Sequence, residues 1–302
     1  MTLLGQPSLG YIAASGAFTV LFAGSSPVVE RAKVLPFVAA GLIASAALGL
    51  LAAPNMWLVL AGVAAVAIGS AALAFGFRLG PPGPLFFVLV FGLSAHVVTS
   101  APIAPAVYLT AFAAGCAFSY LVAVSPLLLP RPRPVAVRPL RELLPGPALD
   151  ADGRMLLLRV AIVSVIGVLL ALIVDPARSY WVVGGAVAVI GVAADRTAAL
   201  QRGLHRMLGT LVGAGLYALL ALLHPAGLWL ALLLGILQFL IELVVVRHYA
   251  LALVFITPLV LLLTGAATGE IGDMSIALER IVDTVVGAAL GAASGFLHPR
   301  RP

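Results

Sequence analysis

Charged residues are scarce in this sequence. Asp, Glu, Lys and Arg together account for 9% of its 302 residues, while hydrophobic residues account for 63%. Soluble domains carry about 25% charged residues, and no stretch of this chain is polar enough to form a large soluble domain. The composition therefore excludes an ordinary soluble protein and predicts an integral membrane protein whose main partner is the lipid bilayer.

Cysteine is nearly absent. The single Cys116 lies in an apolar segment, where we expect a packed residue, and one cysteine cannot form an internal disulfide. The sequence also lacks metal-ligand spacings, glycine-rich nucleotide signatures and a nucleophilic serine elbow. We therefore expect no metal, no cofactor and no enzyme activity. The N-terminus, MTLLGQPSLG, lacks the basic region of a cleavable signal.

The positive charge of the chain is spread between its apolar segments. Lys and Arg number 17 against 11 Asp and Glu, which gives a net charge of +6. A basic soluble surface would indicate nucleic acid binding, but here the basic residues fall in the breaks between hydrophobic runs. Orientation in a membrane explains them better, so no nucleic acid partner is expected.

Apolar runs of helical length predict an all-α integral membrane protein with about eleven transmembrane helices. The runs are too long and too uniformly apolar for the alternating strands of a β-barrel. The predicted spans are 8–24, 34–53, 56–76, 84–100, 104–125, 155–174, 180–194, 207–223, 227–246, 249–265 and 281–297.

Basic residues alternate from loop to loop and predict the topology. The loops after odd-numbered spans contain Arg31 and Lys33, Arg78, Arg131 to Arg154, Arg196 to Arg206, Arg247, and Arg300 and Arg301. The loops after even-numbered spans contain almost none. By the positive-inside rule, the N-terminus of this multi-pass membrane protein lies outside and its C-terminus lies in the cytoplasm.

A linker rich in Pro and Arg divides the chain. It covers residues 131–154 and is expected to be cytoplasmic and extended, acting as a tether. The first membrane repeat, of five helices, covers residues 1–130, and the second, of six helices, covers residues 155–302.

A shift of about 170 residues places one half of the chain over the other. YIAASGAFTVL, from Tyr11, then lies over YWVVGGAVAVI, from Tyr180, and Pro54 lies over Pro225. An even number of spans separates corresponding helices, so the two repeats are expected to be parallel around an axis along the membrane normal. The span 155–174 has no counterpart in the first half, so either the first helix of that repeat is missing or the true start of the chain lies upstream.

Glycine interrupts corresponding spans of the two halves, at Ser15-Gly16 and at Gly184-Gly185. In transporters built from repeats, short or broken helices at matching positions indicate the substrate site. The alternative is that these glycines only let helices pack closely, as is common in membranes. Both interpretations stay open from the sequence.

A stripe of arginine and glycine marks the segment after this break. Arg202, Arg206, Gly209 and Gly213 recur at helical spacing and share one face. The glycines predict close contact with another helix, and the guanidinium groups are candidates for concentrating an organic anion at the cytoplasmic mouth. Topological anchoring is the alternative for the arginines.

Charged residues inside the remaining spans are further candidates. Glu242 is a candidate for proton coupling or for an ion pair with Arg206. Arg280 and Asp283 are three residues apart and are expected to form a structural pair on one helix face. Arg159, four residues into its predicted span, is expected to extend its side chain to the cytoplasmic surface.

Several segments resemble the fusaric acid resistance family of bacterial inner-membrane proteins, which includes aromatic acid exporters and is related to plant aluminium-activated malate transporters. The segments are YWVV at 180–183, QRGLHRMLGTLVGA at 201–214, HYALALVFITPLVLLL at 248–263, ERIVDTVVGAALGA at 279–292 and, in the first half, FRLGPPGPLFFVLVFG at 77–92. The resemblance implies export or passive conduction of small organic or aromatic carboxylate anions.

An exporter is therefore the expected function. A membrane scaffold or accessory subunit without a transport path, and an uncoupled anion channel, are the alternatives. A homo-oligomer is compatible with each of the three.

Overall fold

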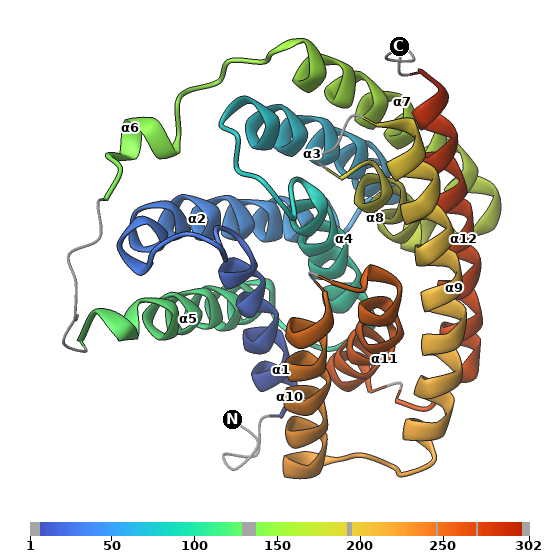
Figure 1. Cartoon of the computed structure of the whole chain (residues 1–302). Coiled ribbons are helices and arrows are strands. Elements are labelled where there is room, and N and C mark those ends of the chain that lie inside the picture. The colour runs from blue at the N-terminus through green and yellow to red at the C-terminus, as the bar shows by residue number, and fades with distance from the viewer. Residues whose placement is uncertain (1–6, 129–136, 192–194, 246, 270, 298–302) are drawn as a thin grey trace.

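The computed structural model describes residues 7–128, 137–191, 195–245, 247–269 and 271–297. Every regular element in these ranges is a helix (Figure 1), which confirms the predicted all-α class for this part of the chain. The helices are α1 Pro7–Ser15, α2 Val28–Ala52, α3 Met56–Gly76, α4 Leu85–Ser100, α5 Pro105–Val124, α6 Leu140–Leu143, α7 Ala151–Val174, α8 Ser179–Ile190, α9 Arg196–Ala221, α10 Gly227–Val244, α11 Tyr249–Thr268 and α12 Met274–Ser294. Short 3-10 helices are η2 Gly16–Leu21, η3 Ser125–Leu128, η4 Pro176–Arg178 and η5 Gly295–Leu297.

Seven of the described helices are long and apolar enough to cross a membrane, namely α2, α3, α5 with η3, α7, α9, α10 and α11. The other predicted spans differ from these in length or charge. With 12 residues, α8 is shorter than the roughly 20 needed for a straight crossing. The 16 residues of α4 are also too few, and α12 carries Glu279, Arg280 and Asp283. Each predicted range holds a helix, but the number of crossings is not confirmed.

Acidic side chains define where three helices of the second half begin. Asp150 accepts a hydrogen bond from the third backbone N–H after it at the start of α7, and Asp195 does the same at the start of α9. Asp273 caps α12, where hydrogen bonds from the Ser275 hydroxyl and backbone N–H lower the pKa of its carboxyl. These caps satisfy backbone donors that the helices leave free and fix the register of the residues that follow.

The helices pair in the same way in both halves. In the first half, α2 packs against α4 and α5, and α5 packs against α1. In the second half, α9 packs against α11 and α12, and α12 packs against α8. These are the pairs that a shift of about 170 residues places in correspondence. In Figure 1, α2, α3 and α5 run across the view while α9, α10 and α12 run down it, and α4 contacts both α8 and α11.

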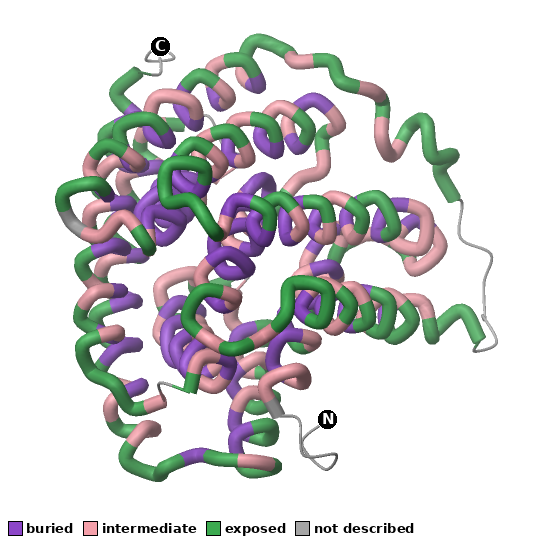
Figure 2. The backbone as a smooth tube through the Cα atoms, turned by 180° about the vertical axis from the view of Figure 1, so that it is seen from behind, coloured by how far each residue is buried: buried purple, intermediate pink, exposed green. Residues whose placement is uncertain are grey.

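The centre of the fold is the short helix α8. Among its residues only Ala188 is not buried, because α4, α7 and α12 all pack around it. Figure 2 shows the contrast with the outer helices, whose buried residues lie on one side only. A helix that is apolar all round is expected in such an interior position.

Glycines let the helices of the second half approach closely. A Cβ atom at Gly209 would lie 2.6 Å from the Cβ of Leu253, and one at Gly213 would lie 2.8 Å from the Cβ of Thr257, both on α11. On α12, a Cβ at Gly287 would meet the backbone of α8. The predicted packing role of the α9 glycines is therefore confirmed.

The described part of the linker is docked on α2. Arg138 donates two hydrogen bonds from its side chain and one from its backbone to the Glu30 carboxylate, which raises the pKa of Arg138. Lys33 in turn donates to the Arg138 carbonyl oxygen at 2.8 Å. The linker arginines Arg131 and Arg133, like Arg300 and Arg301, lie outside the described residues.

Candidate functional site

The arginines of α9 face the interior of the second half. Arg206 is buried, with 7% of its surface exposed, and its Nε has no hydrogen-bond partner. Arg202 is half-buried and donates from Nη1 to the carbonyl oxygen of Ile190, at the end of α8. The Asp195 cap sets the start of α9, and the 3.6-residue period then places positions 202, 206, 209 and 213 on one face, whose glycines meet α11 and whose Arg202 reaches the end of α8.

Two charged residues of α12 are buried next to α8. Arg280 and Asp283 are 5% and 2% exposed, and the guanidinium carbon of Arg280 lies 3.9 Å from the centre of the Trp181 ring. The expected ion pair between them is not formed among the described residues. Stacking on Trp181 holds the guanidinium of Arg280 instead, and its Nε, its Nη1 and Oδ2 of Asp283 have no hydrogen-bond partner.

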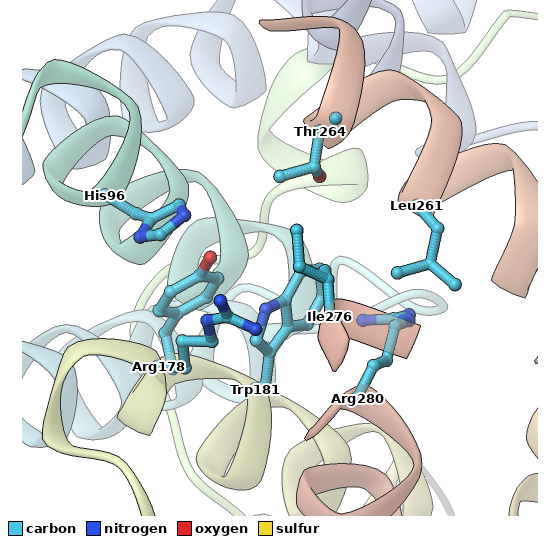
Figure 3. Close-up of a pocket in the computed structure, with 9 residues that line it drawn as sticks. His96, Arg178, Trp181, Leu261, Thr264, Ile276 and Arg280 are labelled. Atoms are coloured by element: carbon cyan, nitrogen blue, oxygen red, sulfur yellow. The ribbon is translucent and has the colours of Figure 1, made fainter. Parts of the chain in front are cut away.

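A small pocket lies where these residues meet the first half of the chain. Residues of α4, η4, α8, α11 and α12 line it, and Arg178 and Arg280 lie on either side of Trp181 in Figure 3. His96 of α4 also faces it, with its ring 6.3 Å from that of Tyr180. The cavity measures about 10 Å³, which is close to the volume that holds one water molecule.

Two ion pairs lie beside this pocket. Arg178 forms an ion pair with Asp175 in its own turn, at 3.6 Å, and another with Glu279 of α12. They tie the turn between α7 and α8 to the start of α12. Local spacing allows the pair of Arg178 with Asp175, three residues apart, but nothing in the sequence pointed to Glu279, which is about 100 residues away.

Arg159 was placed wrongly by the sequence. We expected its side chain at the membrane surface, but it is fully buried and donates from Nε to Ser294 Oγ on α12, at 3.1 Å. The reason is the start of α7: Asp150 caps the helix and Ala151 begins it, so Arg159 lies in the third turn rather than near the end. The Asp-Ala-Asp-Gly sequence at 150–153 is the signal that was available for this earlier start.

Glu242 lies apart from the buried arginines. It is exposed on α10 and accepts a hydrogen bond from Gln238, one turn earlier, at 2.8 Å. No ion pair joins it to Arg206 in the described ranges. The reason is that α10 packs on α11, whereas Arg206 faces inward on α9.

The paired glycine breaks lie in contacts between helices. A Cβ at Gly16 would meet the backbone of α5, and one at Gly184 would lie 2.9 Å from Leu89 of α4. Gly185 faces α12, while Ser15 donates to the carbonyl oxygen of Tyr11 in its own helix. Of the predicted site residues, the structure thus brings Gly185 near the α12 helix that carries Arg280, and it leaves Ser15 and Gly16 in the other half.

Positive charge predominates inside the second half. Among its described residues, the buried charged side chains are Arg159, Arg206, Arg280 and Asp283. Each arginine near the centre of a membrane helix costs about 2.5 to 3.5 kcal/mol on insertion scales. An interior with more guanidinium than carboxylate groups can offset part of this cost by binding an anion.

The comparison with protein families points to the same half of the chain. Residues 155–294, from α7 to α12, match the family described as fusaric acid resistance protein-like, which confirms the family resemblance over this range. The uncharacterized membrane protein YvaC of Bacillus subtilis (strain 168) is 35% identical over 126 residues, which cover 41% of this chain and 20% of that protein. The match thus spans about a fifth of the relative's length. No solved structure matches the chain significantly.

Proposed function

From the match of residues 155–294 to the fusaric acid resistance protein-like family, we propose that this multi-pass membrane protein transports small organic or aromatic carboxylate anions outward across the inner membrane. The observation that carries the proposal is the set of buried guanidinium groups, at Arg206 and Arg280, with N–H groups that have no protein partner. Such groups attract carboxylates and bind them through two parallel hydrogen bonds.

Arg202 and Arg206 are proposed to receive the anion from the cytoplasm. Both lie in the first three turns of α9, which begins at the predicted cytoplasmic side. At the opposite, outer end of the path, Arg280 would bind the carboxylate of the anion and Trp181 would contact its aromatic ring. The two side chains lie together, because the guanidinium of Arg280 stacks on the Trp181 ring.

Movement of helices is part of this proposal. A cavity of about 10 Å³ is too small for an organic anion, so α12 and the turn before α8 must separate to admit one. The ion pair from Arg178 to Glu279 joins these two parts, and Asp175 pairs with Arg178 within the turn. We propose that they hold the outer end closed until the anion arrives.

A membrane scaffold without a permeation path is the second candidate function. The small volume of the pocket favours it, because no space for an organic anion is present there. An anion channel is a variant of the first proposal. Anion current through reconstituted membranes in the absence of a coupling ion would identify a channel.

A deletion strain tests transport in the cell. Loss of an exporter is expected to lower the concentration at which particular aromatic or aliphatic carboxylic acids stop growth, and expression of the chain is expected to restore it. Equal sensitivity of the deletion and parent strains across a panel of such acids would favour the scaffold.

The two repeats and the eleven crossings are proposed together with the function. The matching helix pairs in the two halves support the repeats, and the alternation of basic residues supports an external N-terminus and a cytoplasmic C-terminus. With 12 residues, α8 is too short to cross a bilayer alone, so its crossing in this topology also needs adjoining residues of the chain.

Reporter fusions test this topology. Fusions at the C-terminus and within residues 131–154 are expected to read cytoplasmic, and fusions near Pro54 and Thr268 are expected to read external, because basic loops stay inside. A cytoplasmic signal from a fusion at Thr268 would contradict the eleven-span topology. The measurement is the reporter activity of each fusion, normalised to the expression level of that fusion.

A further inference from the structure

Arg159 is held in one orientation in the interior of the second half. Its side chain is fully buried in the third turn of α7, and its Nε donates to Ser294 Oγ. Ser294 Oγ also donates to the carbonyl oxygen of Gly291 at 2.7 Å, so the hydroxyl is fixed as well. The bond at Nε directs the other edge of the guanidinium, Nη1 and Nη2, away from Ser294.

That other edge has no partner. Neither Nη1 nor Nη2 of Arg159 makes a hydrogen bond within the described ranges, and both atoms are buried. Two terminal nitrogens of one guanidinium form a planar fork of donors, whose geometry matches the two oxygens of a carboxylate. Nearly all buried hydrogen-bond donors in proteins have a partner, so an unpaired buried fork indicates an absent acceptor.

The charge that acts on Arg159 is another cation. The positive charge of Arg202 acts on Arg159 unfavourably, and the guanidinium of Arg202 lies against the backbone at Gly191, where a Cβ would be 2.7 Å from Nη1. The buried acid of this half, Asp283, feels the charges of Asp175, Arg178, Arg280 and Glu279, and neither Arg159 nor Arg202 is among them. No carboxylate of the described residues therefore compensates the pair Arg159 and Arg202.

We propose that Arg159 and Arg202 bind a carboxylate between α7, α9 and α12. Arg159 would hold the two oxygens with its fork, and Arg202 would add charge from the side of α8. The assignment of this carboxylate to the transported anion rests on the proposed function. The site itself rests on the unpaired donors.

Ligand-dependent thermal stability of the purified protein tests this site without transport. Sodium acetate and sodium benzoate are expected to raise the melting temperature of the parent protein above that in sodium chloride of equal ionic strength. Arg159→Gln is expected to weaken the apparent affinity at least about tenfold, since each hydrogen bond to a charged group contributes about 1.5 to 3 kcal/mol. Arg154→Gln removes an exposed arginine from the same helix and is expected to bind like the parent.

Further variants and salts make each outcome decisive. Arg159→Lys keeps the charge but loses the fork, so weakened binding is expected there too, and Arg202→Gln tests the same site if an Arg159 variant does not fold. Stabilisation of the parent by phosphate or sulfate but not by carboxylates would overturn the proposal in favour of an inorganic oxyanion. Equal carboxylate binding by the parent and Arg159→Gln would also overturn it. Binding that depends on Arg159 in a protein that moves no anion would contradict the transport function and leave the site in place.

Discussion

Gly209→Leu and Gly213→Leu are each expected to lower the free energy of unfolding by about 1 to 3 kcal/mol, the usual cost of forcing extra atoms into a packed interface. The first atom added at Gly209 would already lie 2.6 Å from Leu253 Cβ and 2.7 Å from the backbone oxygen of Ala250. The backbone of α11 cannot move aside without disturbing the contact between α9 and α11. Thermal denaturation or unfolding in mixed detergent measures the loss.

Gly215 on the same helix supplies the matched control. It is exposed, and a Cβ there would have no heavy atom within 4 Å. Gly215→Leu is therefore expected to change the free energy of unfolding by less than about 0.5 kcal/mol. Equal melting of the Gly209→Leu and Gly215→Leu proteins would mean that α9 does not pack on α11 through its glycines.

Arg206→Gln is expected to reduce anion transport about tenfold or more while expression stays at the parent level. Arg206 is buried and its Nε is unpaired, so the loss of its charge removes an attraction for the anion without breaking a described ion pair. A hydrogen bond to a charged group contributes about 1.5 to 3 kcal/mol, which corresponds to a factor of ten or more. Initial rates of uptake into inverted vesicles measure the effect.

Arg247→Gln is the control for charge alone. Arg247 is also a basic residue at the predicted cytoplasmic side, but it is exposed. We expect the variant to transport anions like the parent. If the Arg206→Gln and Arg247→Gln proteins both transport like the parent, Arg206 acts only as a topological anchor.

The sequence predicted the positions of the helices because long apolar runs and their breaks report directly on burial in a membrane. Spacing also predicted the inward face of α9, since residues at i, i+4 and i+7 share a face in any straight helix. The four segments of the second half that resemble the fusaric acid resistance family predicted the match of residues 155–294 to the model of that family. These features depend on local order along the chain.

The features that the sequence did not predict depend on which helices meet. Arg159 reaches Ser294 on α12, and Arg178 reaches Glu279, across more than 100 residues of sequence. Spacing allowed an ion pair between Arg280 and Asp283, but the Trp181 ring on α8 provides the contact for Arg280. No periodicity within one helix contains this information.

The most direct test of the transport proposal is flux of a carboxylate into liposomes that contain only the purified protein. Saturable uptake of at least one aromatic or aliphatic carboxylate, above the rate in empty liposomes and reduced about tenfold by Arg206→Gln, is the predicted result. Uptake at the rate of empty liposomes for every carboxylate that stabilises the protein would contradict transport and identify a scaffold.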